Sequence, residues 1–150
     1  MAEIPFTEKT AVISITDYDD EQVVLKNVPE YILHLTFDDV DNDVVFDEVG
    51  VHPTYDELKN TEDKYHMFTD AHAEKVADFY LNCRDNIDVL ICQCEHGQSR
   101  SAAIAAAILE YKYKSGIKIF SDDRYYPNKV VFRKLLDALN NKRKRVCEND

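Results

Sequence analysis

The sequence predicts an α/β fold in which a central, mostly parallel sheet is flanked by helices. Short apolar stretches typical of strands alternate along the chain with longer stretches that have the spacing of helices. One strand candidate, residues 88–93 (DVLICQ), is almost continuously apolar, which is typical of strands buried on both faces of a parallel sheet. The length of 150 residues fits one domain.

Two strand candidates lie in the N-terminal half of the chain. Residues 11–16 (AVISIT) alternate apolar and polar side chains, and residues 31–37 (YILHLTF) form a second strand-like stretch. An acidic run from Asp38 to Asp43 follows this second stretch. The sequence from there to Tyr65 is irregular and rich in charge, and a loop of this length in a compact domain is usually functional.

Helices are predicted on both sides of the apolar strand. Thr69 or Asp70 can cap a helix that ends near Asn82. Residues 101–114 form an alanine-rich helix, whose small side chains allow close approach to a sheet. Gly116 follows at the place of a helix C-cap glycine.

A last helix is expected to begin at Pro127 and Asn128, and the charged residues 140–150 are expected to fray. The whole chain, residues 1–150, is thus predicted to form one domain. We expect the strand at residues 88–93 to lie in the middle of the sheet. Cys94 then lies beyond the carboxyl end of that strand, where open α/β sheets bind their ligands.

The overall charge of the chain disfavours some classes of binding partner. The net charge is −11, which argues against nucleic acid because Lys and Arg supply most of the binding to a phosphate backbone. The same charge argues against anionic membrane surfaces. No stretch reaches the roughly 18 apolar residues needed to span a bilayer, and no signal peptide is visible. We expect a cytoplasmic protein that has no nucleic-acid or membrane partner.

The four cysteines are expected to be reduced, because disulfides are rare in cytosolic proteins. The nearest approach to a zinc site is the group Cys92, Cys94 and His96, which lacks a second pair of ligands. Cys92 and Cys94 are two residues apart, so they are expected to face the same side of a strand. We interpret Cys92 as a structural residue, since a disulfide between such close neighbours is strained.

The segment that carries the most chemistry is residues 93–101 (QCEHGQSRS), between the apolar strand and the alanine-rich helix. Backbone N–H groups after Cys94 and the dipole of the helix can together surround one anion. Gly97 allows a bend with positive φ. Arg100 can close the ring with a planar fork that holds two oxygens of a phosphate.

The same surroundings are expected to lower the pKa of the Cys94 thiol below that of free cysteine. The thiolate is the nucleophilic form, so groups that hold phosphate also prepare the nucleophile. Ser101 can donate a hydrogen bond to this thiolate. The alternative is an accidental Cys and Arg pair around a structural thiol. A buried strand, the Cys, a Gly, Ser-Arg-Ser and an alanine-rich helix in this order favour the anion-binding loop.

Residues 94–101 (CEHGQSRS) resemble the signature loop of the protein tyrosine and dual-specificity phosphatases. Residues 11–16, residues 33–41 (LHLTFDDVD) and Pro127-Asn128 extend the resemblance to compact bacterial and phage members. The resemblance implies the cysteine-phosphatase fold, a cysteinyl-phosphate intermediate on Cys94, and no metal or other cofactor. It implies a phosphate-binding loop made of Glu95, His96, Gly97, Gln98, Ser99 and Arg100.

The family also takes a general acid from an Asp on a loop after an earlier strand, and such a group contributes typically 10²–10⁴-fold to the rate. Alignment of Leu35 with the last inward apolar residue of that strand places Asp39 at this position. Asp38 and Asp41 are the alternatives. A solvated acidic turn is the other interpretation of the whole run.

One residue departs from the family pattern. Most members have His directly before the catalytic Cys, and this chain has Gln93. Gln donates a hydrogen bond but carries no charge, so the loop is expected to form with reduced activity. A pseudophosphatase that binds phosphate without turnover is therefore the alternative, although the presence of both Cys94 and Arg100 favours an enzyme.

The expected function is hydrolysis of phosphotyrosine, with phosphoserine and phosphothreonine as possible further substrates. The expected partners are a phosphorylated protein or a small phosphomonoester, with phosphate or sulfate binding in the loop. Glu95 and the lack of further basic residues in the loop disfavour inositol polyphosphates and 5′-phosphorylated RNA. A rhodanese-like sulfurtransferase also uses a Cys loop at a strand end, and the Ser-Arg-Ser ending disfavours that class.

Overall fold

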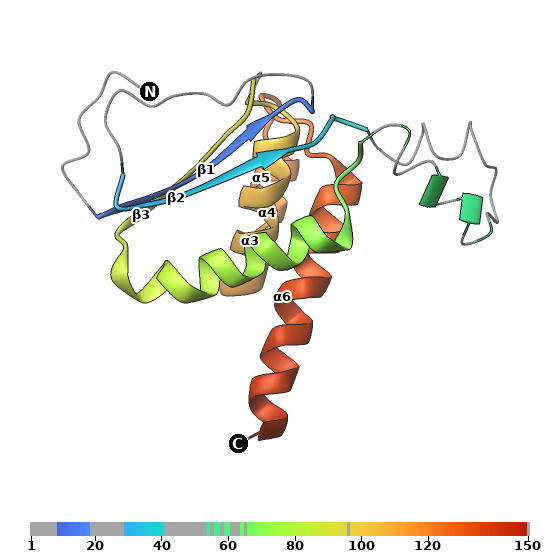
Figure 1. Ribbon diagram of the computed structural model, residues 1–150. Coiled ribbons are helices and arrows are strands. Elements are labelled where there is room, and N and C mark those ends of the chain that lie inside the picture. Colours follow the sequence, from blue (N-terminus) through green and yellow to red (C-terminus); the bar gives the residue numbers. More distant parts are fainter. Residues whose placement is uncertain are drawn as a thin grey trace.

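The computed structural model describes residues 9–18, 29–40, 66–95 and 97–149, together with residues 54, 56, 57, 59, 60 and 64. The predicted strands and the first two predicted helices begin within one residue of their expected positions. Figure 1 shows how these elements are arranged. In chain order the elements are β1 (Thr10–Thr16), β2 (Tyr31–Thr36), α3 (Asp70–Cys83), the 3₁₀ turn η1 (Arg84–Asn86), β3 (Val89–Gln93), α4 (Arg100–Tyr113), α5 (Ile117–Phe120) and α6 (Lys129–Asn149).

The three strands form a parallel sheet in the order β2-β1-β3. The register pairs Ser14 of β1 with His34 of β2 on one side and with Gln93 of β3 on the other. Because all strands run the same way, their carboxyl ends meet at one edge of the sheet. The predicted parallel sheet with flanking helices is therefore confirmed.

The prediction that the apolar strand lies in the middle of the sheet is wrong for the described part of the chain. There β1 is central and fully buried, whereas β3 pairs only with β1 and is half-buried along its whole length. The polar residues of β1 hid its position, because Thr10, Ser14 and Thr16 are all buried. Small hydroxyl side chains at these positions made a buried strand resemble one with a solvated face.

The hydrophobic core lies between one face of the sheet and the helices α3, α4 and α6, which lie together on one side of the sheet in Figure 1. Ile13, Ile15 and Leu35 face these helices, and alternate residues of the strands face the other way. The alanines of α4 let this helix approach the sheet closely, as the sequence predicted. The fully buried side chains from the helices include Ala73, Val76, Ala77, Ala103, Ile104, Ala107, Val131, Leu135 and Leu139.

The start of α3 is capped as predicted. Thr69 is the N-cap, and its side chain accepts a hydrogen bond from the backbone N–H of His72. The ring of His72 in turn accepts from the backbone N–H of Thr69, at 2.9 Å. This reciprocal pair satisfies two backbone donors that the first turn leaves open.

The end of α4 differs from the prediction. Lys114, not Gly116, is the residue in the left-handed conformation, with φ 57°. Gly116 has an ordinary negative φ and stands before α5. It is needed for space, because a Cβ atom there would lie 2.7 Å from the carbonyl oxygen of Ala106.

Helix α6 begins after Asn128, as expected, and continues to Asn149. Asn128 accepts hydrogen bonds from the backbone N–H groups of Val130 and Val131, which fixes the first turn. The expected fraying of residues 140–150 stays a prediction. No helix in the described ranges is both long and apolar enough to cross a bilayer.

Candidate active site

The predicted anion-binding loop connects the carboxyl end of β3 to the first residue of α4, Arg100. Gly97 has φ +68°, a left-handed conformation that favours glycine. A Cβ atom at Gly97 would meet nothing within 4 Å, so the requirement is conformational and not steric. His96, which was predicted within the loop, lies outside the described residues.

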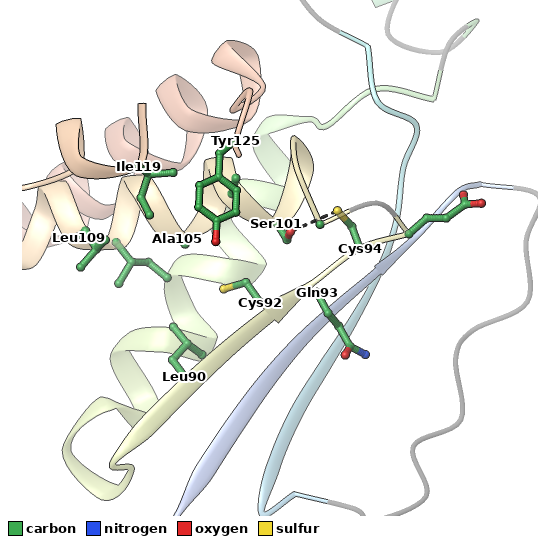
Figure 2. Close-up of a pocket in the computed structure, with 13 residues that line it drawn as sticks. Leu90, Cys92, Gln93, Cys94, Ser101, Ala105, Leu109, Ile119 and Tyr125 are labelled. Atoms are coloured by element: carbon green, nitrogen blue, oxygen red, sulfur yellow. Dashed lines mark hydrogen bonds between the residues drawn. The ribbon is translucent and has the colours of Figure 1, made fainter. Parts of the chain in front are cut away.

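The Sγ atom of Cys94 lies 3.2 Å from Oγ of Ser101, as Figure 2 shows. Burial of the Cys94 thiol opposes its ionisation, but hydrogen bonds from Ser101 and Gly97 and the charge of Arg100 outweigh this effect. The net result is a pKa of Cys94 below the ordinary value for cysteine. The thiolate therefore forms more readily here than in an ordinary cysteine, at the residue that the sequence predicted as the nucleophile.

Arg100 is buried, and its guanidinium is anchored at the carboxyl ends of the two other strands. Its Nη1 donates to Oδ1 of Asp17 at 2.6 Å and to the carbonyl oxygen of Phe37 at 2.8 Å. No hydrogen bond joins Nε or Nη2 to another described residue. These two nitrogens can form the fork that holds two phosphate oxygens.

Asp39 contacts the loop directly. Its Oδ1 accepts hydrogen bonds from Oγ of Ser99 at 2.8 Å and from Nδ2 of Asn128 at 2.8 Å. Asp38 lies differently, because its Oδ1 accepts from the backbone N–H of Tyr18 at 3.0 Å. Asp41, the other predicted alternative, is outside the described part of the chain. Of the two candidates that the structure describes, Asp39 is the one bound to the loop.

The side chain of Gln93 turns away from Cys94. Its Nε2 donates to Oγ of Ser14 at 3.1 Å, and in Figure 2 its amide lies on the side of β3 opposite to the sulfur of Cys92. The side chain thus ties β3 to the central strand. It stabilises the strand on which the loop begins and makes no described hydrogen bond within the loop.

A cavity of about 680 Å³ lies between β3, α4 and the segment that contains α5 and Tyr125. Both Cys92 and Cys94 line it, so the prediction that they face the same side is confirmed. Burial and, to a smaller extent, the nearby Cys94 together raise the pKa of Cys92 to about 12. Cys92 is therefore a protonated wall residue. The cavity is lined by Leu90, Cys92, Gln93, Cys94, Glu95, Gly97, Ser101, Ala102, Ala105, Ile108, Leu109, Ile119 and Tyr125.

Two residues of this site were missed by the sequence analysis. Asp17 directly follows β1, as Cys94 directly follows β3, so the shared carboxyl edge of a parallel sheet is a signal that could have found it. Asn128 was recognised only as the start of a helix. Its contact with Asp39 joins residues 89 positions apart, and no local pattern encodes such a contact.

Potential metal ligands do not cluster within the described ranges. No group of three or more His, Cys, Asp or Glu side chains there has an arrangement that could hold a metal ion. The groups that the described site brings together are the thiol of Cys94, the guanidinium of Arg100, the carboxyl group of Asp39, the hydroxyls of Ser99 and Ser101, and backbone N–H groups.

No family model matches this chain, and no curated protein sequence matches it. Among solved structures, the chain is similar to PTPMT1, a phosphatase of the protein tyrosine and dual-specificity superfamily. The crystal structure of PTPMT1 in complex with PI(5)P has a TM-score of 0.51 and 19% identity, covering 91% of this chain and 80% of that chain. A second crystal structure of PTPMT1 has a TM-score of 0.49 and 18% identity, covering 92% and 80%. The fold is that of the cysteine phosphatases, as the sequence predicted.

Proposed function

We propose that this protein is a cysteine-dependent phosphatase that hydrolyses phosphotyrosine through a cysteinyl-phosphate intermediate, with phosphoserine and phosphothreonine as further substrates. The observation that carries the proposal is the lowered pKa of Cys94, whose sulfur lies beside Ser101 at the start of α4. A thiolate at the amino end of a helix, next to an anchored arginine, combines a nucleophile with an anion site.

In the first step, the Sγ atom of Cys94 attacks the phosphorus atom and the bond from phosphorus to the ester oxygen breaks. Asp39 gives a proton to the departing oxygen. Arg100 and the backbone N–H groups of the loop stabilise the charge on the three remaining oxygens. The phenol or alcohol leaves, and the phosphoryl group stays on sulfur.

In the second step, water attacks the phosphorus atom of the intermediate and the bond from sulfur to phosphorus breaks. Asp39, now ionised, accepts a proton from the attacking water. The leaving group is the Cys94 thiolate, which the hydroxyl of Ser101 stabilises by a hydrogen bond at the 3.2 Å separation of the two atoms. Inorganic phosphate is released, and the starting thiolate is restored.

The substrate class follows from charge and from the loop. The net charge of −11 disfavours highly anionic substrates. Glu95 in the loop is acidic, so it offers no positive charge to a second phosphate group. A single phosphomonoester group, on a protein or a small molecule, carries little enough negative charge to bind such an acidic protein. Free phosphate or sulfate should occupy the same loop. PTPMT1 in complex with PI(5)P is consistent with phosphomonoester binding by this fold. A reactive thiolate also suits the reducing cytoplasm.

One observation favours a second candidate, a pseudophosphatase that binds phosphate without turnover. The side chain of Gln93 is engaged with Ser14, at 3.1 Å, and supplies no charge to the thiolate. In this alternative the loop binds phosphopeptides and the cysteinyl phosphate does not form.

Hydrolysis of p-nitrophenyl phosphate separates the two candidates. We expect the wild-type protein to release p-nitrophenol and Cys94→Ser to fall to the uncatalysed background, because the serine hydroxyl is a far weaker nucleophile. Cys147→Ser, in the last turns of α6, is the matched control and should keep full activity. Wild-type inactivity with retained phosphopeptide binding would instead establish the pseudophosphatase.

A further inference from the structure

Asn128 uses both polar atoms of its side chain, and their partners lie on two different segments. Its Oδ1 accepts from the backbone N–H groups of Val130 and Val131, at 3.0 Å and 3.2 Å. Its Nδ2 donates to Oδ1 of Asp39 at 2.8 Å and to the carbonyl oxygen of Val40 at 3.0 Å. The residue is 3% exposed. One buried amide thus joins the start of α6 to the segment that carries Asp39.

The phosphate-binding loop completes a closed network with the same residue. The backbone N–H of Asn128 donates to the carbonyl oxygen of Ser99 at 3.2 Å. Oγ of Ser99 donates to Oδ1 of Asp39 at 2.8 Å. Asp39, Ser99 and Asn128 are therefore bonded in a ring, and the position of Asp39 relative to the loop is fixed from two directions.

Only asparagine satisfies this arrangement. Aspartate and serine can accept from the first N–H groups of α6 but have no Nδ2 to donate to Asp39. Glutamine has the same amide on a longer side chain, which would place it beyond the distances observed. The need for asparagine at position 128 therefore comes from its contacts with Asp39 and Val40 as much as from the capping of α6.

We propose that Asn128 is a positioning residue, which holds the carboxyl group of Asp39 beside the loop for proton transfer to the leaving group. This inference rests on the proposed function. Two hydrogen bonds fix Oδ1, and Oδ2 makes none with the described residues, so Oδ2 can carry the proton. Without Nδ2, the exposed carboxylate keeps only the bond from Ser99 and moves among several orientations. A displacement of about 1 Å in a catalytic group can cost about 100-fold in rate.

A general acid has a signature that a merely structural residue lacks. Phenolate is a strongly basic leaving group and needs a proton as its bond breaks, whereas p-nitrophenolate is weakly basic and leaves with little help. Loss of Asp39 positioning should therefore lower kcat for phenyl phosphate much more than kcat for p-nitrophenyl phosphate. A loosened fold or a damaged anion site lowers both alike, or raises KM.

The experiment measures kcat and KM for both substrates in Asn128→Ser and Asn128→Asp. Both variants retain an oxygen that can cap α6, so thermal melting should show that they fold. We expect kcat for phenyl phosphate to fall about 10- to 100-fold, with a change of less than about threefold for p-nitrophenyl phosphate and no change in KM. Asn82→Asp, on the exposed surface of α3, makes the same chemical change away from the site and should have wild-type kinetics.

Asp39→Asn and the double variant Asp39→Asn with Asn128→Asp make the outcomes distinguishable. If Asn128 acts through Asp39, the double variant should be no slower than Asp39→Asn alone. In the double variant the amide and the carboxylate are exchanged, so the hydrogen bond between residues 39 and 128 can form again, whereas the bond to the carbonyl oxygen of Val40 stays lost. The melting temperature should therefore recover in part from that of Asn128→Asp, while phenyl phosphate hydrolysis stays slow.

Three results would overturn a part of this account. Equal losses for both substrates in Asn128→Ser and Asn128→Asp would make Asn128 structural only and leave the proposed phosphatase intact. Unchanged leaving-group dependence in Asp39→Asn would remove Asp39 as the acid, and the inference with it. Activity that survives Cys94→Ser would refute the proposed function itself.

Discussion

Cys94 is a residue on which two opposing influences act. Burial raises the pKa of its thiol, and the hydrogen bonds from Ser101 and Gly97 together with the charge of Arg100 lower it by more. The other two cysteines that the structure describes, Cys83 and Cys92, have raised pKa values, because burial is the largest influence on their thiols. At a pH below the ordinary cysteine pKa, the Cys94 thiol should therefore react before those of Cys83 and Cys92.

Removal of the Ser101 hydroxyl should raise the pKa of Cys94. The hydroxyl stabilises the thiolate, so Ser101→Ala should move the pH midpoint of iodoacetamide alkylation at Cys94 to higher pH. Mass spectrometry of the alkylated protein over a pH series measures that midpoint. Ser121→Ala, an exposed serine at the end of α5, should leave it in place. The same midpoint in Ser101→Ala and the wild type would show that the hydroxyl does not favour the thiolate.

At the scale of elements, α4 connects the site to the rest of the fold. Its first residue is Arg100, its alanines pack against the sheet, and its second half lies close to Gly116, the residue before α5, which approaches Ala106 and Glu110. A helix packed in this way keeps its amino terminus, and the loop before it, in one position.

Gly116→Ala tests the close approach at the end of α4. The added Cβ atom would lie 2.7 Å from the carbonyl oxygen of Ala106 and 3.0 Å from Cβ of Glu110, so backbone has to move. We expect the free energy of unfolding to fall by about 1–3 kcal/mol, measured by urea denaturation. Lys118→Ala, at an exposed position of α5, should change it by less than about 0.5 kcal/mol. An unfolding free energy in Gly116→Ala equal to that of the wild type would contradict the packing described.

The same scale shows where sequence reasoning reached its limit. Periodicity located β1, β2, β3 and the helices α3 and α4, because alternation and helical spacing are local properties. It did not give the order of the strands. The order of the strands depends on long-range pairing, in which β1 pairs with both β2 and β3. The buried Thr and Ser side chains of β1 made it look like a strand with one solvated face, so its central position was not predicted.

On the scale of the whole molecule, the parallel sheet gathers residues from three distant parts of the chain at one edge. Asp17 follows β1, Asp39 follows β2 and Cys94 follows β3, so the site is assembled by topology. A motif predicted the loop from Cys94 to Arg100, because the loop is contiguous. No local pattern predicted the contacts of Arg100 with Asp17 and of Asn128 with Asp39, since they join residues 83 and 89 positions apart. Only the shared carboxyl edge of the sheet pointed toward Asp17.

Under the proposed function, the assembled edge also gives an acidic protein a local site for an anion. The net charge of −11 is spread over the chain, whereas the guanidinium of Arg100 is buried at the start of α4. Local dipoles and one buried cation set the potential within the loop. The distant acidic residues weaken the attraction of highly charged substrates without preventing the binding of one phosphate group.

The most direct test of the central claim is to trap the intermediate on Cys94. The protein is mixed with p-nitrophenyl phosphate, quenched within one turnover and digested, and the phosphorylated peptide is identified by mass spectrometry. The proposed mechanism predicts phosphate on the sulfur of Cys94 and none in Cys94→Ser. Turnover of the substrate with no phosphate on Cys94, or with phosphate on a different residue, would contradict it.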